Sequence, residues 1–375
     1  MLILSIFIST VYILLIVDLV RGFNRLPEFF PEKTTSQNSF TIIVPFRNEA
    51  KNLPTLLNSF SRLNYPLNQF EILMVNDDSS DDFQFIIDQF IIENAGVQIE
   101  VIKNIRKTSS PKKDAIESAI LKAQFDWIIS TDADCEAPAN WLNNLDAFLQ
   151  KNNVKMIVAP VAYSIENKFL DHFQNLDFLS LQGTTMGSFG INRPFMCNGA
   201  NLCYAKQVFK TVNGFEGNDH IASGDDIFLM EKFISSYPTQ VKYLKSFDAV
   251  VRTKPQPDLG ALIQQRVRWA AKMGSTKIIF GKIIGITVLT ANSYLLLLFS
   301  LAVFRQISWQ YPGLFFLVKI NVDFILLFKT SDFFKQKESM RSYLGSSFIY
   351  PFFSVYIAFA SFFKGYQWKG RVFKK

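Results

Sequence analysis

Long apolar runs near the two ends form the strongest hydrophobic pattern in the chain. The first covers residues 2–20, contains Asp18 as its only charge, and is followed by Arg21 and Arg25. Because about 20 apolar residues form a helix long enough to cross a bilayer, this run predicts a transmembrane helix over residues 1–21. A cleavable signal peptide carries its positive charges before the apolar stretch, so we expect a retained anchor whose carboxyl end is cytoplasmic.

Three further apolar runs follow in residues 276–375, for which we predict a C-terminal membrane domain. They cover residues 283–304, 313–328 and 347–363. The second contains Lys319 and Asp323, which are four residues apart and would pair along one face of a helix. The third contains Pro351, which weakens the interior of a helix.

The number of crossings affects the predicted topology. If all four runs cross and the middle of the chain is cytoplasmic, the C-terminus lies outside. The tail is basic, and basic segments favour the cytoplasmic side. Its positive residues are Lys364, Lys369, Arg371, Lys374 and Lys375. We therefore expect the last run to be re-entrant or interfacial.

Residues 22–275 show a different pattern, in which short β-rich runs alternate with helix-like stretches. The β-rich runs cover residues 40–45, 70–75, 97–102 and 126–130, and a helix-like stretch covers residues 112–123. This alternation predicts an α/β domain with a mostly parallel sheet. Such sheets bind ligands beyond the carboxyl ends of their strands, so we expect the site there.

Composition narrows the class of protein. Of the 375 residues, 49% are hydrophobic and 19% are charged, which excludes a disordered or collagen-like chain. The three cysteines and two histidines show no zinc-site spacing. Any bound metal would then be a hard cation held by carboxylates.

The net charge of +7 is unevenly distributed. Residues 276–375 hold 13 basic and 3 acidic residues, a net charge of +10, which leaves −3 for residues 1–275. The positive charge therefore coincides with the most apolar region, which indicates a membrane anchor with cationic loops. We expect membrane lipids, and no nucleic acid, among the partners.

Pairs of aspartates follow the predicted strands. Asp132 and Asp134 form either a polar loop or a site for a divalent cation that bridges a diphosphate. Asp77 and Asp78 either cap the next helix or accept a hydrogen bond from the imide N–H of a uracil-like base.

A third acidic pair and a lysine pair flank helix-like stretches. Asp225 and Asp226 either cap the helix that follows them or supply a general base for an acceptor hydroxyl. Lys112 and Lys113 follow a proline and are either solvated or placed to neutralise a phosphate. Gly199, in a predicted turn, would allow the backbone to approach a ligand closely.

Two helical segments carry further alternatives. Gln265 and Arg268 lie three residues apart on one helix face. This face could present a guanidinium to a diphosphate while Trp269 stacks on a sugar. Alternatively, Arg268 and Trp269 form an interfacial membrane anchor. Residues 167–195 are amphipathic and either lie on a membrane surface, which would favour a lipid acceptor, or belong to the packed core.

Six motifs, taken in order, resemble those of the family 2 inverting glycosyltransferases, in the membrane-embedded branch that includes cellulose, chitin and hyaluronan synthases and ceramide glucosyltransferases. They cover residues 44–49, 76–81, 131–134, 198–201, 224–226 and 265–269. The Gln-x-x-Arg-Trp motif is the most specific of them. The resemblance implies a GT-A fold, a Rossmann-like α/β nucleotide-diphospho-sugar transferase domain flanked by transmembrane helices.

The resemblance also implies roles for individual residues. Asp226 is the implied general base, and Asp134 and Asp132 are the implied ligands of Mn²⁺ or Mg²⁺. The implied substrate-binding residues are Pro45, Arg47, Glu49, Asp77, Asp78, Lys112, Asp132, Asn198, Gly199, Asp225, Gln265, Arg268 and Trp269. Lys113 remains an alternative to Lys112, because the sequence around the pair departs from the family pattern.

The implied activity is transfer of a sugar from a nucleotide-diphospho-sugar, a UDP-sugar being favoured, with inversion of configuration. The acceptor is a hydroxyl of a lipid, lipid-linked or glycan molecule at the cytoplasmic face of the cell (inner) membrane. The alternatives are a catalytically inactive nucleotide-sugar-binding protein of the same fold and a processive polysaccharide synthase. A dehydrogenase is disfavoured because no Gly-x-Gly-x-x-Gly turn follows the first strand.

Overall fold

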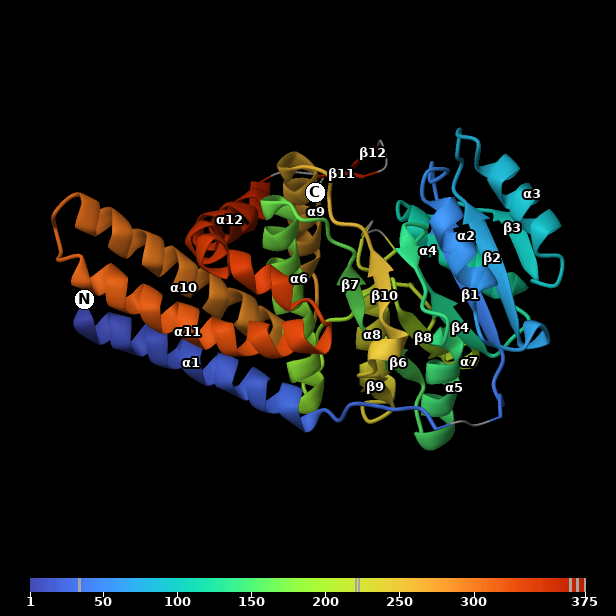
Figure 1. Cartoon of the computed structure of the whole chain (residues 1–375), viewed down its shortest axis with the longest axis horizontal. Helices are drawn as coiled ribbons and strands as arrows, with labels where there is room; N and C mark the ends of the chain where they lie inside the picture. The colour runs from blue at the N-terminus through green and yellow to red at the C-terminus, as the bar shows by residue number, and fades with distance from the viewer. Residues whose placement is uncertain (33–34, 220, 222, 364–365, 369–370, 374–375) are drawn as a thin grey trace. The chain divides into compact units, whose positions relative to one another are not determined.

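A computed structural model describes residues 1–32, 35–219, 221, 223–363, 366–368 and 371–373 (Figure 1). The chain divides into two units. The sheet unit comprises Pro27–Ser164 and Cys197–Lys254, and the helical unit comprises Met1–Leu26, Ile165–Met196 and Pro255–Lys375. This division differs from the three consecutive segments expected from the sequence, because two helices inside residues 22–275 belong to the helical unit.

The sheet unit is built on a seven-stranded mixed sheet, in the order β3-β2-β1-β4-β8-β6-β9. These strands are β3 (Ile99–Lys103), β2 (Phe70–Asn76), β1 (Phe40–Phe46), β4 (Trp127–Ser130), β8 (Leu202–Ala205), β6 (Met156–Val158) and β9 (Val241–Tyr243). Strands β1 to β4 pair in parallel, as predicted, whereas β8 is antiparallel to β4 and β6.

The burial of their side chains explains why strands β1 and β2 could be predicted from the sequence. The side chains of β1 and β2 are almost all buried, and a parallel strand covered on both faces reads as a continuous apolar run. Pro45 is tolerated within β1 because the pairing of β1 with β4 ends at Ile43, opposite Ser130.

Helices and a smaller sheet complete this unit. The helices are α2 (Leu53–Ser61), α3 (Phe83–Glu93), α4 (Pro111–Lys122), α5 (Trp141–Lys151), α7 (Lys206–Thr211) and α8 (Asp225–Ser236). The second sheet has the order β5-β10-β7, with strands β5 (Cys135–Glu136), β10 (Val251–Thr253) and β7 (Val161–Tyr163).

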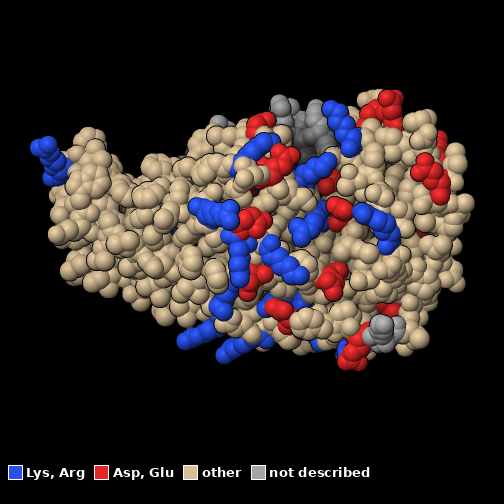
Figure 2. Space-filling model, viewed as in Figure 1, with Lys and Arg blue, Asp and Glu red and all other residues tan. Residues whose placement is uncertain are grey.

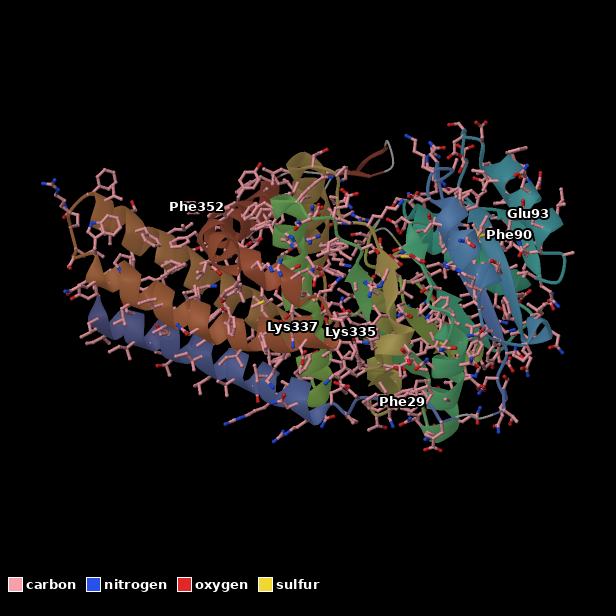
Figure 3. The ribbon with its side chains drawn as sticks, viewed as in Figure 1. Phe29, Phe90, Glu93, Lys335, Lys337 and Phe352 are labelled. Atoms are coloured by element: carbon pink, nitrogen blue, oxygen red, sulfur yellow. The ribbon has the colours of Figure 1, made fainter. Side chains whose placement is uncertain are left out.

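Within the described residues, the helical unit contains four helices that are long and apolar enough to cross a membrane, one of them with a 3-10 turn at its start. They are α1 (Leu2–Arg25), α10 (Ile279–Val303), α11 (Gln310–Phe333) and α12 (Tyr343–Phe363), the last preceded by the 3-10 turn η3 (Lys337–Ser342). Charged side chains are sparse over the surface of α1, α10 and α11 (Figure 2). Phe352 lies on the outside of α12 and is 63% exposed (Figure 3).

The predicted apolar runs correspond to these helices with shifted ends. Pro351 lies inside α12 without interrupting it. The short hairpin of β11 (Tyr366–Trp368) and β12 (Arg371–Phe373) follows. Lys364, Lys369, Lys374 and Lys375, on which the expected side of the C-terminus depends, lie outside the described residues.

Two more helices belong to the helical unit, α6 (Phe169–Gly190) and α9 (Leu259–Met273). Phe173, Phe178 and Leu179 of α6 are at most 4% exposed. The packed-core alternative for residues 167–195 therefore describes this helix.

A polar cluster lies among the apolar helices. Lys319 Nζ is 2.6 Å from Asp323 Oδ2, and the hydroxyl of Tyr12 donates to Asp323 Oδ1 at 2.6 Å. The predicted pair is therefore present, and α1 supplies a third member. These side chains line a cavity of about 110 Å³ together with residues of α6, α10 and α12. Charges inside a bilayer require such pairing.

Glycines set the separation of α1 and α6. A Cβ added at Gly187 would lie 2.5 Å from the carbonyl oxygen of Leu19, and one added at Gly190 would lie 1.9 Å from the carbonyl oxygen of Gly22. Gly22 of α1 faces α6 in the same way, since a Cβ there would lie 2.0 Å from the carbonyl oxygen of Gly187, and small residues at such positions let helices approach closely. The two backbones touch because these positions carry no side chain.

Gly190→Ala should destabilise the helical unit by about 1–3 kcal/mol, because the new methyl group meets backbone that cannot rotate away. The measurement is the thermal unfolding temperature in detergent. Gly285→Ala on α10 is the matched control, since a Cβ there meets no atom within 4 Å. Equal unfolding temperatures for both variants and the parent would contradict this account of the helix contact.

Candidate active site

Aspartates gather beyond the carboxyl ends of the parallel strands. Asp77 and Asp78 follow β2, and Asp132 and Asp134 follow β4. Strand order reverses between β1 and β4, and this is where α/β sheets bind ligands. The predicted acidic positions therefore lie at the predicted edge of the sheet.

Lys112 joins two of the acidic pairs. Pro111 begins α4, and Lys112 in its first turn places Nζ 2.7 Å from Asp132 Oδ1 and 3.0 Å from Asp225 Oδ2. Burial lowers the pKa of Lys112, but Asp132 and Asp225 raise it more, so the net pKa is raised and the side chain stays charged. The ammonium group offsets carboxylates that would otherwise repel each other.

Lys113 has a different task. Its ammonium group donates to the carbonyl oxygens of Asn218 at 2.6 Å and Ile221 at 2.9 Å, and it lies over the rings of Phe215 and Phe228. The structure thus brings Lys112 to Asp132 and Asp225.

Asp132 and Asp134 are both half-buried in the loop after β4. Burial, followed by the charge of Asp132, raises the pKa of Asp134 to about 6. The thiol of Cys135 donates to Asp134 Oδ1 at 3.8 Å. Carboxylates one residue apart in the same loop, at Asp132 and Asp134, are oxygen donors of the kind that hard divalent cations prefer. Among the described residues, no group of three or more potential protein ligands gathers, so the remaining positions would fall to substrate or water.

Asp226 is fixed by backbone donors. Gly224 takes a left-handed conformation, with φ of +84°, before α8, so that Asp225 and Asp226 enter the first turn of the helix. The amide of Ile227 donates to Asp226 Oδ1 at 2.8 Å, and the amide of Gly199 donates to Oδ2 at 3.3 Å. Asp226 is 8% exposed, so its carboxylate is largely desolvated.

Gly199 is required by a close approach. A Cβ at this position would lie 3.0 Å from Asp225 Oδ2 and 3.4 Å from Lys112 Nζ. The backbone of Gly199 therefore lies close to the charged side chains of Asp225 and Lys112. Asn198 stabilises the same turn, since its Oδ1 accepts from the amide of Ala200 at 3.0 Å.

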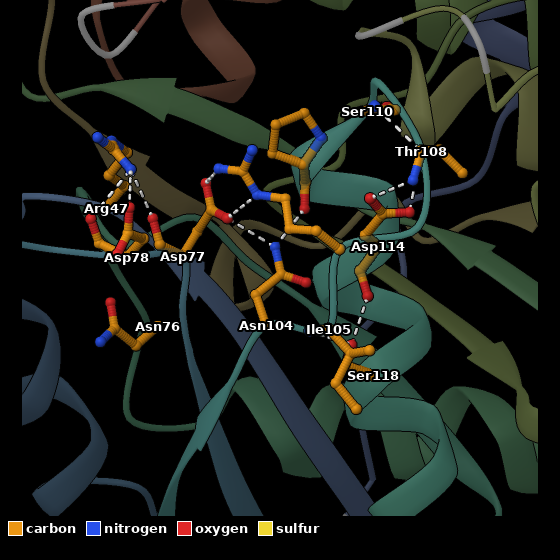
Figure 4. Close-up of polar contacts among 12 residues, drawn as sticks. Arg47, Asn76, Asp77, Asp78, Asn104, Ile105, Thr108, Ser110, Asp114 and Ser118 are labelled. Atoms are coloured by element: carbon orange, nitrogen blue, oxygen red, sulfur yellow. Dashed lines mark hydrogen bonds and ion pairs between the residues drawn. The ribbon is translucent and has the colours of Figure 1, made fainter.

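Arg47 and Asp77 build a second part of the site (Figure 4). Arg47 Nη1 donates to the carbonyl oxygens of Asp77 at 2.9 Å and Asp78 at 3.0 Å, which holds Asp78 at a φ of +61°. The Asp77 carboxylate accepts from Asn104 at 2.7 Å and from two nitrogens of Arg106 at 2.7 and 2.9 Å. Glu49, two residues after Arg47, is buried, and its carboxylate accepts a hydrogen bond from the side-chain amide of Asn52.

Arg106 and Asn104 are functional residues that the sequence does not mark, since a lone Arg and Asn after a strand carry no motif. The sequence also assigns no role to Asn201. That side chain is 1% exposed, accepts from the indole N–H of Trp141 at 2.9 Å, and donates to the carbonyl oxygens of Pro160 and Ala249 at 2.8 Å each. It anchors the turn that carries Gly199.

Gln265, Arg268 and Trp269 lie on α9 in the helical unit and are half-buried there. Between them, Arg266 is buried and forms an ion pair of 2.5 Å with Asp177 of α6. Val267 packs on Ile357 and Ala360 of α12. The helix is therefore held on two sides within its own unit.

Comparison with known proteins gives consistent matches. The family model "Glycosyl transferase family 2" matches residues 41–210, and "Glycosyl transferase family group 2" matches residues 127–361. Glycosyltransferase AglE of Haloferax volcanii is 21% identical over 234 residues, which cover 61% of this chain and 70% of AglE.

Solved structures are also similar. Mannosyltransferase PcManGT from Pyrobaculum calidifontis, in complex with GDP-Man and Mn²⁺, has a TM-score of 0.59 at 15% identity and covers 93% of this chain and 95% of its own. S. aureus TarS 1–349 in complex with UDP-GlcNAc has a TM-score of 0.45 at 12% identity and covers 89% and 95%. At these identities the likeness to the mannosyltransferase concerns the fold.

Asn201→Ala should destabilise the sheet unit by about 3 kcal/mol, because an indole N–H and two buried carbonyls lose their partner. Asn198→Ala removes a single hydrogen bond at a half-buried position, so it serves as the control with a loss of at most about 1 kcal/mol. Thermal unfolding in detergent compares the two. A smaller loss for Asn201→Ala than for Asn198→Ala would contradict the anchoring role.

Proposed function

The chain belongs to glycosyl transferase family 2 and is a GT-A glycosyltransferase that moves a sugar from a nucleotide sugar, and from this premise we propose that it works by metal-assisted single displacement with inversion. The proposed acceptor is a hydroxyl of a lipid, lipid-linked or glycan molecule. The proposal rests on one cluster of contacts. In it, Lys112 forms ion pairs with Asp132 and Asp225, and the backbone amide of Gly199 donates a hydrogen bond to Asp226.

The carboxylate pair after β4 fits a divalent cation. Asp134 and Asp132 would hold Mn²⁺ or Mg²⁺, because both are oxygen donors, and burial and the charge of Asp132 raise the pKa of Asp134, which a bound cation would offset. The similar PcManGT structure contains Mn²⁺. When bound, the cation would stabilise the negative charge of the departing diphosphate.

Asp226 is the proposed general base. The acceptor oxygen attacks the anomeric carbon, its proton passes to Asp226, and the bond from that carbon to the diphosphate oxygen breaks with both electrons leaving on the diphosphate. Attack opposite the leaving group inverts the configuration. The two backbone amides on Asp226 orient its carboxylate, and its burial keeps water from competing for the proton.

Other side chains are proposed to bind the donor. Asp132 and Asp225 raise the pKa of Lys112, so its ammonium group stays charged. It would bind a phosphate oxygen of the donor in place of one of its contacts with these carboxylates. The turn after β2, held by Arg47, would receive the nucleoside. The remaining proposed contacts come from Pro45, Glu49, Asp77, Asp78, Asn198, Gly199, Gln265, Arg268 and Trp269.

The proposed location is the cytoplasmic face of the cell (inner) membrane. The support is the set of four long apolar helices together with Arg21 and Arg25 at the carboxyl end of the first. An inactive nucleotide-sugar-binding protein is the alternative from another class, and the assembled cluster around Asp226 speaks against it.

Asp226→Asn should lower sugar transfer by about 10²- to 10⁴-fold, because an amide cannot accept the proton, while donor binding is kept. Release of nucleoside diphosphate from UDP-glucose, UDP-GlcNAc and GDP-mannose with Mn²⁺ measures turnover, and calorimetry measures binding. Asp88→Asn, an exposed position on α3, is the control and should retain full turnover. Full turnover by Asp226→Asn would overturn the assignment.

Chelation with EDTA should abolish turnover, and Mn²⁺ should restore it in the parent protein. In Asp134→Asn, added Mn²⁺ should restore far less, because one oxygen ligand has been replaced by a poorer one. The same nucleotide-release measurement applies. Equal restoration in both proteins would place the cation elsewhere.

A further inference from the structure

The side chain of Arg266 lies at the centre of the α9 segment, yet the family motif gives it no part in binding. It is 5% exposed, whereas Gln265, Arg268 and Trp269 are half-buried. A buried guanidinium requires partners that compensate its charge and fill its donor positions. Its partners in this structure identify what it does.

Three of those partners come from two helices. Nε of Arg266 donates to Asp177 Oδ2 of α6 at 2.5 Å, in a pair whose side chains are 5% and 7% exposed. Nη1 of the same guanidinium donates to the side-chain oxygen of Gln265. The guanidinium carbon lies 4.2 Å from the centre of the Trp269 ring.

This arrangement fixes two neighbours at once. A planar guanidinium can form hydrogen bonds along its edge while its face stacks on an aromatic ring, which a lysine cannot do. Arg266 uses its edge for Asp177 and Gln265 and its face for Trp269. The indole is also bounded by Phe178 of α6, at 6.1 Å between ring centres.

We infer that Arg266 and Asp177 are positioning residues, which hold the amide of Gln265 and the indole of Trp269 in one orientation for the nucleotide sugar and its acceptor. This inference rests on the proposed function, in which Gln265 and Trp269 belong to the substrate-binding set. Arg266 acts through those side chains. Asp177 fixes Arg266 from the neighbouring helix, so α6 contributes to the site indirectly.

Packing on another face of α9 makes this role specific. Val267, next to Arg266, is 3% exposed and packs on Ile357 and Ala360 of α12. The backbone of α9 is therefore held by apolar contacts as well. Loss of the Arg266–Asp177 pair should release the two side chains while the helix stays in place.

The test compares four variants of the full-length protein in detergent. Asp177→Asn removes the anionic partner, Arg266→Gln removes the cation, and Arg266→Lys keeps a charge for Asp177 but lacks the planar group. Asp323→Asn is the control, since Lys319 and Asp323 form another ion pair of the helical unit, 2.6 Å long, in which Lys319 is buried and Asp323 is half-buried. Every variant is labelled with 5-fluorotryptophan, and the Trp269 resonance is assigned from Trp269→Phe.

The first readout is the ¹⁹F resonance of Trp269. We expect Asp177→Asn, Arg266→Gln and Arg266→Lys to shift or broaden it, and Asp323→Asn to leave it unchanged. The second is nucleotide release from UDP-glucose, UDP-GlcNAc and GDP-mannose, in which Asp177→Asn and Arg266→Gln should lower kcat/KM about 100-fold, as misplacement of a substrate-positioning group does. Arg266→Lys should keep the unfolding temperature but not kcat/KM.

An unchanged Trp269 resonance in Asp177→Asn and Arg266→Gln would overturn the inference, and so would an equal shift in Asp323→Asn. If Arg266→Lys keeps both the parent resonance and the parent kcat/KM, any cation at this position suffices. The pair would then be a structural ion pair, and the inference would be overturned. Failure of the proposed function is distinguishable, because it appears as full turnover by Asp226→Asn. The ¹⁹F resonance of Trp269 tests the positioning role even if no nucleotide release is detected.

Discussion

The ion pairs of Lys112 with Asp132 and Asp225 are the interaction on which the sheet unit's candidate site depends. They join the loop after β4 to the start of α8, two segments far apart in the chain. Without a cation between them, the carboxylates of Asp132, Asp134 and Asp225 would repel one another and separate. The fold brings these acids together and places the ammonium group of Lys112, whose side chain is 15% exposed, between Asp132 and Asp225.

Small residues and backbone donors complete that arrangement. Gly199 allows its own amide to reach Asp226, and Gly224 allows the chain to turn into α8. Asn201 fixes the first of these turns to α5 and to the segments before β7 and β10. The charged side chains are thus oriented by a rigid frame, which is the condition under which electrostatic groups act without reorganisation.

Much of this could be predicted because its signals are local. The strands β1, β2 and β4 are continuous apolar runs, and the aspartates directly follow β2 and β4, so an α/β unit with an acidic edge followed from pattern alone. The paired arrangement of Lys319 and Asp323 followed from a spacing of four residues. The antiparallel β8 was not predicted, because direction within a sheet is decided by tertiary packing.

Partners distant in the chain could not be predicted. Arg106 reaches Asp77 across 29 positions, Trp141 reaches Asn201 across 60, and Arg266 reaches Asp177 across 89. No periodicity marks such pairs, because only the folded chain brings their atoms together. The same reason explains why α6 and α9 belong to the helical unit although their sequences lie among those of the sheet unit: their apolar faces pack on α1, α11 and α12.

The central claim is that the cluster around Lys112 and Asp134 is the nucleotide-sugar site. Anomalous scattering at the manganese edge, from crystals grown with Mn²⁺ and either UDP or GDP, tests it most directly. We expect a single strong peak beside the carboxylates of Asp132 and Asp134, with the diphosphate density next to Lys112. A manganese peak remote from both aspartates, with the nucleotide bound there, would contradict it.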